Sequence, residues 1–346
     1  MKIVVVMGGN TSEREVSLRS GAGVAHALEK LGHEVSLLDT GTGQFLKSAE
    51  HAMALGKGAG APAQGGIPAM RDPKEVETYV RAIPRSADLV FIALHGGDGE
   101  NGTLQALLDM AGISYTGSGV LASAVAMDKA MSKRMFVFEG IPTPAWVERW
   151  APEDPSAPWN PALSAEELER LGGYPVIVKP NEEGSSVGIT VVRQGSELRA
   201  AMDEARRYGR LVLIESFIEG RELTVGVIDE RTLPVVEIVP EDGWYDYRHK
   251  YTSGASRYLV PAPIPDETSE RLFDLSLRAC RALRVRGVAR VDFRLSPDGE
   301  AYCLEVNTVP GLTELSLVPK AAAAAGMSYE GLIQAIVDAT PLRATR

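Results

Sequence analysis

Polar and apolar residues alternate along two neighbouring segments near the end of the chain. Residues 289–295 and 302–307 each change character at every second position, which is typical of half-buried strands. The intervening residues 296–299 read Ser-Pro-Asp-Gly, a turn-forming sequence, so we predict an antiparallel hairpin. With a symmetric turn, Asp292 would lie opposite Cys303 and diagonal to Glu305.

The polar face of this predicted hairpin would carry Asp292, Cys303, Glu305 and Asn307, with Arg290 beside them. Two carboxylates that lie close together repel each other unless a cation lies between them. Ligands that are all oxygen suit a hard ion such as Mg2+, and a nearby arginine suggests phosphate chemistry. An acidic, solvent-exposed face with salt bridges is the plain alternative.

The start of the chain has the hydrophobic pattern of a βαβ unit, which implies a parallel sheet. An apolar run at 2–7 is followed by two glycines, a helical pattern from about 13 to 31 and a second strand at 33–38. We predict further strands at 88–94 and 113–116, with a helix at 103–111 between them.

The second half of the chain predicts a separate group of elements. The expected strands are 174–179, 189–193, 211–217, 222–229 and 234–239, and the expected helices are 196–208, 268–283 and 329–340. Residues 241–254 are polar and aromatic without any period, which favours a functional lid over a core segment.

Two segments in the middle of the chain have residues suited to a nucleotide. Lys179 ends an apolar strand, and the Gly-Ser-Ser-x-Gly loop at 184–188 can turn backbone N–H groups toward an anion. Glu215 and Glu222 bracket a break between two strands, where backbone groups can bind an adenine edge and Glu222 the ribose hydroxyls. A plain hairpin and a plain connecting turn with solvated glutamates are the alternatives.

A different enzyme class is suggested by residues 117–122, Gly-Ser-Gly-Val-Leu-Ala, which match the dinucleotide pattern G-x-G-x-x-A. An NAD-dependent oxidoreductase would also need an acidic residue at the end of a second strand about 20 residues further on. The sequence offers none there, so we rank this class lower.

Two single residues near the predicted parallel sheet are also candidates for a role in binding or catalysis. His95 ends an apolar strand before a glycine cluster, where it can orient a substrate or act as a structural histidine. Glu13 lies near a helix N-terminus, where it can serve the helix dipole or hold a substrate ammonium.

The composition of the chain indicates which cellular compartment and which classes of partner to expect. The chain has 346 residues, of which 45% are hydrophobic and 24% charged, enough for two or three domains. A net charge of −10 argues against a nucleic-acid surface. Only two cysteines are present, which indicates a reducing compartment, and no apolar run approaches the ~20 residues of a membrane helix. We therefore expect a cytoplasmic protein without membrane or nucleic-acid partners.

Taken together and in this order, the segments resemble the ATP-grasp superfamily, and within it the D-alanine–D-alanine ligase family. The matching stretches span nearly the whole chain and are residues 8–17, 95–102, 127–133, 179–188, 245–251, 290–292 and 305–316. The resemblance implies a three-domain α/β fold: an N-terminal parallel-sheet domain, residues 1–125, and two α+β ATP-grasp subdomains, residues 126–218 and 219–346. The last would carry the metal site and a lid at about 241–257.

The resemblance also implies a reaction, in which two D-alanines are joined through an acyl phosphate at the expense of ATP for peptidoglycan synthesis. It implies two Mg2+ (or Mn2+) ions and a homodimer. Another ATP-grasp carboxylate–amine ligase, specific for a different amino acid, stays open as the alternative.

Individual roles follow from the resemblance. The residues that would bind the nucleotide are Lys129, Lys179, Glu215, Phe217, Ile218 and Glu222, and those that would bind the metal ions are Asp292, Glu305 and Asn307. The residues that would act on D-alanine and the reacting groups are Glu13, Ser185, Tyr251, Arg290 and Gly311, with His95, Lys250 and Ser316 in substrate contact. In this scheme Glu13 binds the first ammonium, Ser185 and Tyr251 link to it, and Arg290 with Gly311 holds the oxyanion.

Overall fold

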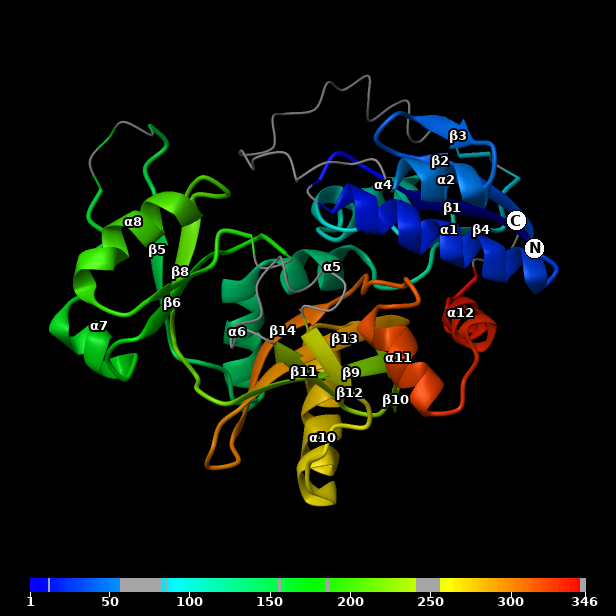
Figure 1. Cartoon of the computed structure of the whole chain (residues 1–346). Coiled ribbons are helices and arrows are strands. Elements are labelled where there is room, and N and C mark those ends of the chain that lie inside the picture. Colours follow the sequence, from blue (N-terminus) through cyan, green and yellow to red (C-terminus); the bar gives the residue numbers. More distant parts are fainter. Residues whose placement is uncertain are drawn as a thin grey trace.

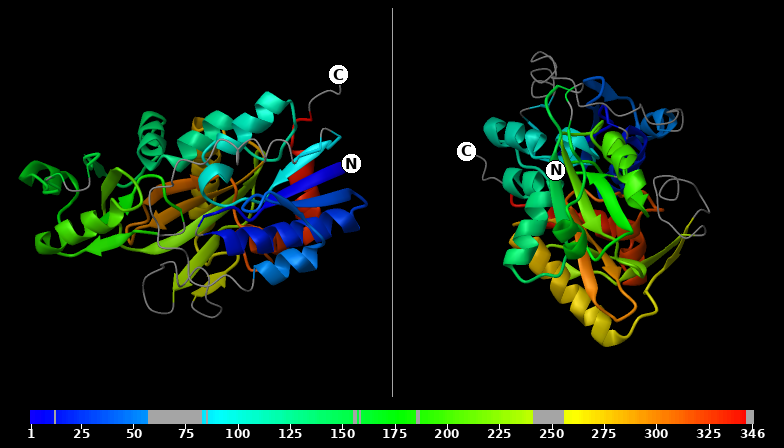
Figure 2. Two further views of the ribbon diagram at one scale, coloured as in Figure 1. Left: turned by 90° about the horizontal axis from the view of Figure 1, so that it is seen from above. Right: turned by 90° about the vertical axis from the view of Figure 1, so that its left-hand side faces the viewer.

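The computed structural model describes residues 1–11, 13–56, 83–84, 86–154, 157, 159–184, 187–240 and 256–342. Within these ranges the strands form three sheets, of four, six and four strands. The six-stranded sheet lies between the other two (Figures 1 and 2). The fold is α/β, as the sequence pattern predicts.

The first sheet contains the predicted parallel strands. Its order is β3-β2-β1-β4, and β1 pairs in parallel with both β2 and β4. The strands are β1 (Lys2–Met7), β2 (Glu34–Asp39), β3 (Gln44–Leu46) and β4 (Leu89–Ile92), and the helices around them are α1 (Arg14–Lys30), α2 (Ala49–Leu55), η1 (Gly97–Gly99) and α4 (Thr103–Ala111). The expected strand at 113–116 is reduced to a single bridge between Val90 and Tyr115.

The other four-stranded sheet is antiparallel throughout, in the order β5-β8-β6-β7. Its strands are β5 (Trp146–Trp150), β6 (Val176–Pro180), β7 (Thr190–Val192) and β8 (Leu211–Ser216). Two helices, α5 (Val120–Met127) and α6 (Lys129–Phe138), connect it to the first sheet, and α7 (Ala165–Arg170) and α8 (Gly195–Ala205) belong to it. Apolar residues of α8 and of these strands form one buried cluster.

The six-stranded sheet has the order β12-β11-β9-β13-β14, with β10 beside β9. Its strands are β9 (Arg221–Ile228), β10 (Arg231–Thr232), β11 (Val236–Pro240), β12 (Ser256–Leu259), β13 (Val288–Leu295) and β14 (Ala301–Asn307), and the helices that follow or cover them are α10 (Asp266–Ala282), α11 (Leu317–Ala324) and α12 (Tyr329–Asp338). Of the expected lid at 241–257, residues 241–255 lie outside the described residues.

The predicted final hairpin is confirmed, but its predicted register is wrong. Phe293 pairs with Cys303 and Asp292 pairs with Glu305, so that Leu304 is an extra residue in β14. This bulge turns Cys303 into the apolar core, where it is fully buried, instead of onto the polar face. Helix α6 covers that side of β14 with Phe136, and a buried thiol packs there as a small apolar group.

The C-terminal helices return to the first sheet. Buried residues of α12, including Ile333 and Ile336, share one core cluster with Ile3 of β1 and Leu28 of α1. Figure 2 shows α12, in red, beside the blue helix α1. The loop between β14 and α11 is therefore brought against the carboxyl ends of the parallel strands. No helix in the described part of the chain is both long and apolar enough to cross a membrane.

Candidate active site

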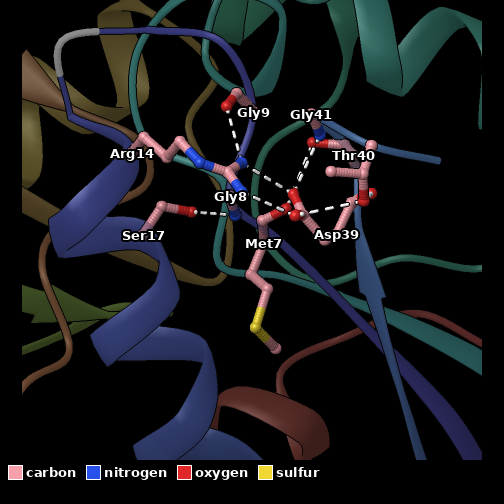
Figure 3. A network of polar contacts seen from close by, with 9 residues as sticks. Met7, Gly8, Gly9, Arg14, Ser17, Asp39, Thr40 and Gly41 are labelled. Atoms are coloured by element: carbon pink, nitrogen blue, oxygen red, sulfur yellow. Dashed lines mark hydrogen bonds and ion pairs between the residues drawn. The ribbon is translucent and has the colours of Figure 1, made fainter. Parts of the chain in front are cut away.

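The turn that leads from β1 into α1 is fixed by an ion pair to β2 (Figure 3). Arg14 Nη1 and Nη2 donate to the two carboxylate oxygens of Asp39 at 2.8 and 2.7 Å, and Nη1 also donates to the Gly9 carbonyl at 2.9 Å. Burial raises the pKa of Asp39, but hydrogen bonds and charge from Arg14 outweigh it, and the pKa lies below its usual value. Glu13, the residue before α1, is held in place by this turn.

Glu13 approaches two glycines from different parts of the chain. A methyl group at Gly96 would lie 2.7 Å from Glu13 Oε2, and one at Gly184 would lie 3.4 Å from the same atom. The carboxylate therefore lies between the segment after β4 and the loop after β6. Ser185, the next residue of that loop, lies outside the described residues.

His95 joins three segments of the site. Its Nδ1 lies 3.0 Å from the Val309 carbonyl oxygen, and its Nε2 lies 3.0 Å from Ser20 Oγ of α1. Glu100 Oε1 is 3.7 Å from Nδ1. Burial lowers the pKa of His95, but the Glu100 carboxylate outweighs this and the pKa is raised, which favours the imidazolium. With both ring nitrogens engaged, His95 positions the Val309 segment.

The segment from Val309 to Ser316 is tied to neighbouring helices. Ser20 Oγ accepts from the Leu312 N–H at 3.3 Å, and Tyr329 Oη donates to the Leu312 carbonyl at 2.6 Å. Ser316, which precedes α11, accepts from the Thr313 N–H at 3.1 Å. Gly311 is so close that an added methyl group would lie 2.8 Å from Ser316 Oγ. The two predicted substrate-site residues Gly311 and Ser316 are therefore neighbours.

Glu215 lies between two lysines inside the protein. Lys179 Nζ is 2.8 Å from Oε2, and Lys133 Nζ is 3.2 Å from Oε1. Burial raises the pKa of Glu215, but the charges of Lys133 and Lys179 outweigh it and lower the pKa. Lys133 also donates to Thr143 Oγ1 at 2.8 Å and lies 5.3 Å from the Trp146 ring centroid. The Glu215 side chain is thus a counter-ion between two cations.

Sequence reasoning gave no role to Lys133. The signal available was that Lys133 is the second lysine of the 127–133 stretch, four residues after Lys129. Lys129 takes a different direction: its Nζ donates to the Glu183 carbonyl at 2.6 Å and lies 3.4 Å from Glu305 Oε2. The two lysines therefore engage different carboxylates.

Asp292 accepts four hydrogen bonds from three side chains around it. Arg290 Nε and Nη2 donate to its two oxygens at 2.8 and 2.7 Å. Thr224 Oγ1 donates at 2.6 Å and Asn307 Nδ2 at 3.1 Å. Glu305 is its partner in the strand register. A cation at this carboxylate would compete with Arg290 for the same oxygens.

The residues present nevertheless fit a hard divalent cation. Asp292 and Glu305 occupy paired positions of β13 and β14, and Asn307, two residues further along β14, contacts Asp292, so that the three side chains can supply oxygen donors. Among the described residues no group of three His, Cys, Asp or Glu side chains has a metal-binding arrangement. The predicted set contains two carboxylates and one carboxamide, a combination that Mg2+ accepts when phosphate oxygens complete its shell.

The turn between β8 and β9 contacts β13 through Arg294. The guanidinium donates to the carbonyls of Ile218 and Gly220 and lies near Glu222. Phe217 and Ile218 are half-buried. Sequence reasoning gave no role to Arg294.

One cavity of about 710 Å³ collects most of the predicted substrate residues. Its lining comes from the elements around all three sheets, with Gly184 contributed by the loop after β6. The other lining residues include Glu13, His95, Glu222, Arg290, Asp292, Asn307, Gly311 and Ser316. Lys129, Lys179, Glu215 and Glu305 are not in its lining; they form two ion pairs, Lys129 with Glu305 and Lys179 with Glu215. Lys250 and Tyr251 lie outside the described residues.

The dinucleotide pattern at 117–122 has a structural explanation. Arg286 Nε donates to the Gly117 carbonyl at 3.2 Å, and a methyl group at Gly287 would lie 3.0 Å from Gly117 Cα. The glycine loop is packed against the segment before β13. Its small residues permit this close approach of two backbones.

Comparison with known proteins agrees with the geometry. The chain matches the family model described as D-ala D-ala ligase N-terminus over residues 2–118 and the model described as D-ala D-ala ligase C-terminus over residues 136–338. It is 42% identical over 342 residues to the D-alanine–D-alanine ligase of Syntrophotalea carbinolica, covering 99% of this chain and 97% of the relative. It is 43% identical over 341 residues to that of Gloeobacter violaceus, covering 98% and 99%.

Solved structures give the same result. The D-alanine–D-alanine ligase of Bacillus anthracis complexed with ATP superposes with a TM-score of 0.74 at 32% identity, over 98% of this chain and 97% of that one. The VanG D-Ala:D-Ser ligase of Enterococcus faecalis superposes with a TM-score of 0.79 at 29% identity, over 97% and 98%. The oxidoreductase alternative is therefore wrong. This chain is a member of the D-alanine–D-alanine ligase family, with the ATP-grasp fold.

Proposed function

We propose that the protein joins two D-alanines into D-alanyl-D-alanine, with conversion of ATP to ADP and phosphate, for peptidoglycan synthesis. The observation that carries this proposal is the shared cavity, which is lined by Glu13, Arg290, Asp292, Gly311 and Ser316. In this cavity Glu13 would bind an ammonium and Arg290 an oxyanion. The β13–β14 pair, which carries Asp292, would face the nucleotide. Membership of the family supports the same reaction.

The first half of the reaction is a phosphoryl transfer. A carboxylate oxygen of the first D-alanine attacks the γ-phosphorus of ATP, the bond to the β-phosphate oxygen breaks, and ADP leaves. We assign Lys129, Lys133 and Lys179 to the charge that develops on the phosphate oxygens. Asp292, Glu305 and Asn307 would hold two Mg2+ (or Mn2+) ions, which neutralise phosphate charge when bound.

The second half is an acyl transfer. The neutral amine of the second D-alanine attacks the acyl carbon, the bond from that carbon to the phosphate oxygen breaks with its electron pair on oxygen, and the nitrogen releases one proton, which the departing phosphate can accept. Arg290 and the backbone N–H of Gly311 would stabilise the tetrahedral oxyanion, and Ser316 would bind the carboxylate of the attacking D-alanine.

We assign the first D-alanine to the region around Glu13. The carboxylate would bind its ammonium, and His95, through the Val309 segment, would position the oxyanion groups. For Ser185, Lys250 and Tyr251 the assignment rests on the sequence resemblance alone. So do the division at 125/126 and 218/219 into three domains, the homodimer and the cytoplasmic location.

The alternative is a ligase that takes a second amino acid other than D-alanine, since a D-Ala:D-Ser ligase shares this fold at 29% identity. Phosphate release, measured against a panel of D- and L-amino acids with the dipeptide product identified by mass, decides between them. D-Alanine alone should support full turnover; turnover that requires D-serine or another acid would reject the substrate assignment.

A further inference from the structure

One arginine from β13 holds the turn that joins β8 to β9. The backbone of Arg294 pairs with that of Glu222 in β9. Its guanidinium donates from Nε to the Ile218 carbonyl at 3.2 Å and from Nη2 to the Gly220 carbonyl at 2.8 Å. Its Nη1 lies 3.5 Å from Glu222 Oε2. A single side chain therefore contacts both ends of the turn and the carboxylate that follows it.

The backbone of the turn lies directly on the end of β13. Gly220 has a φ of +130°, and a methyl group there would lie 2.0 Å from the Leu295 carbonyl oxygen. Only glycine allows this approach. The turn therefore cannot move away from β13 without breaking the contacts to Arg294.

The charge and shape of the Arg294 guanidinium suit it to hold the turn and the Glu222 carboxylate in place. Its planar fork serves several acceptors at once, and hydrogen bonds from a charged donor are stronger than those between neutral groups. The side chain is 18% exposed, so its bonds are partly shielded from water. The neighbouring Arg221 cannot replace it, because Arg221 is engaged with both oxygens of Glu237.

We propose that Arg294 is a positioning residue for the nucleotide: it orients the peptide groups of residues 218–220 for the adenine edge and the Glu222 carboxylate for the ribose hydroxyls. This inference rests on the proposed function, in which that turn and Glu222 bind ATP. Arg294 acts through these groups and not on the reacting atoms. Its loss should therefore weaken nucleotide binding and leave D-alanine use unchanged.

The test compares Arg294→Gln with the unmodified protein in ADP-release assays with ATP, 2′-deoxy-ATP and 3′-deoxy-ATP. The KM for ATP should rise about tenfold, as expected for loss of charged hydrogen bonds, with kcat and the KM for D-alanine within about twofold. The KM for each deoxynucleotide should rise by a clearly smaller factor. Each analogue lacks one of the hydroxyls that Glu222 would bind, so displacement of Glu222 removes fewer hydrogen bonds from its complex. The preference for ATP over both analogues should therefore fall.

Arg271→Gln is the matched control, since Arg271 pairs with Glu300 near the same hairpin and its side chain is 40% exposed. It should leave all three KM values unchanged. Arg294→Lys keeps the positive charge but not the fork, so it should show a smaller rise in the same direction. If Arg294→Gln does not fold, Arg294→Lys serves as the test variant.

An unchanged KM for ATP would overturn the role of Arg294. An equal rise for all three nucleotides would overturn its role in orienting Glu222 toward the ribose, because the three nucleotides share the adenine and differ only in the ribose hydroxyls. Failure of the proposed function would look different: the unmodified protein would show no D-alanine-dependent ADP release at all.

Discussion

Lys133 Nζ lies 3.2 Å from Glu215 Oε1 in the interior of the protein, where the two side chains are 0% and 3% exposed. Lys179 approaches the other oxygen of the same carboxylate. The arrangement brings two positive charges together next to the strand pair that we assign to the metal ions. Two cations can share this space only because Glu215 lies between them.

The pKa of Lys133 predicts how nucleotide use depends on pH. Burial lowers this pKa to about 8, and the Glu215 charge only partly opposes the effect. The ammonium is therefore present below pH 8 and is lost as the pH rises through that value. We expect kcat/KM for ATP to fall above about pH 8 in the unmodified protein.

Lys133→Arg separates this lysine from other titrating groups, because a guanidinium keeps its charge in the whole range. A pH profile of kcat/KM for ATP between pH 6.5 and 9.5 should lose its alkaline decrease in this variant. An identical decrease in both proteins would show that another group is responsible.

Glu215→Gln should be strongly destabilising. It leaves Lys133 and Lys179 close together without a counter-ion, and removal of one partner from a buried ion pair typically costs about 3–5 kcal/mol. Urea unfolding at pH 7 measures the loss. Glu204→Gln is the control, because Glu204 pairs with Arg207 on the surface at 42% exposure and should matter by less than about 0.5 kcal/mol. Equal effects of the two substitutions would contradict the buried counter-ion role.

The bidentate pair of Arg14 and Asp39 should make the first sheet sensitive to acid. The folded-state pKa of Asp39 is depressed, so the pair stabilises the fold fully above the unfolded-state pKa near 3.8 and loses this contribution as the pH falls through the lower, folded-state value. Thermal unfolding between pH 2 and 6 should show Arg14→Met less stable than the unmodified protein above pH 4, and the two should converge at lower pH. A constant difference at every pH would reject this linkage.

The close approach of Glu13 to Gly96 predicts a selective effect on D-alanine. Gly96 has a φ of +69°, and a methyl group there would lie 2.7 Å from Glu13 Oε2. Gly96→Ala should displace the carboxylate and raise the KM for D-alanine several-fold while leaving the KM for ATP nearly unchanged. The magnitude corresponds to about 1–2 kcal/mol, typical of a weakened charged hydrogen bond.

Gly112 provides a matched control, with a φ of +73° and nothing within 4 Å of an added methyl group. Gly112→Ala imposes the same backbone strain without the contact to Glu13. If both substitutions raise the KM for D-alanine equally, strain and not displacement of Glu13 explains the result.

Local patterns in the sequence predict most of the fold but not the register of the hairpin. The strand at residues 2–7, helix α4 and the pairing of β13 with β14 all follow from hydrophobic period and turn residues. The bulge at Leu304 does not, because it depends on α6 packing over Cys303 from a distant part of the chain. Helix α6 itself has few turn signals and was not predicted.

In the candidate site too, the sequence predicts local features but not contacts between distant residues. Asp292, Glu305 and Asn307 follow from one hairpin, and their proximity is a local property. The contact of Lys133 with Glu215 and that of Arg294 with Ile218 join residues 76 or more positions apart. Single-sequence patterns contain no information on such pairs, since charge and spacing along the chain do not fix which groups meet in space.

The metal assignment predicts that Glu305→Gln loses nearly all turnover while the fold stays intact. The carboxylate is half-buried and lies 3.4 Å from Lys129, so its loss also removes the counter-ion of a lysine that we assign to the phosphates. Activity titrated with MgCl2, together with the unfolding midpoint, checks this. Near-normal activity at low Mg2+ would remove Glu305 from the ligand set.

The most direct test of the central claim follows oxygen atoms through the reaction. D-Alanine labelled with 18O in its carboxylate is turned over with unlabelled ATP in unlabelled water, and the released phosphate is analysed by mass. An acyl-phosphate route predicts one 18O atom in each phosphate, because the attacking carboxylate oxygen stays on phosphorus when the amide forms. Phosphate without label, formed alongside the dipeptide, would contradict the account.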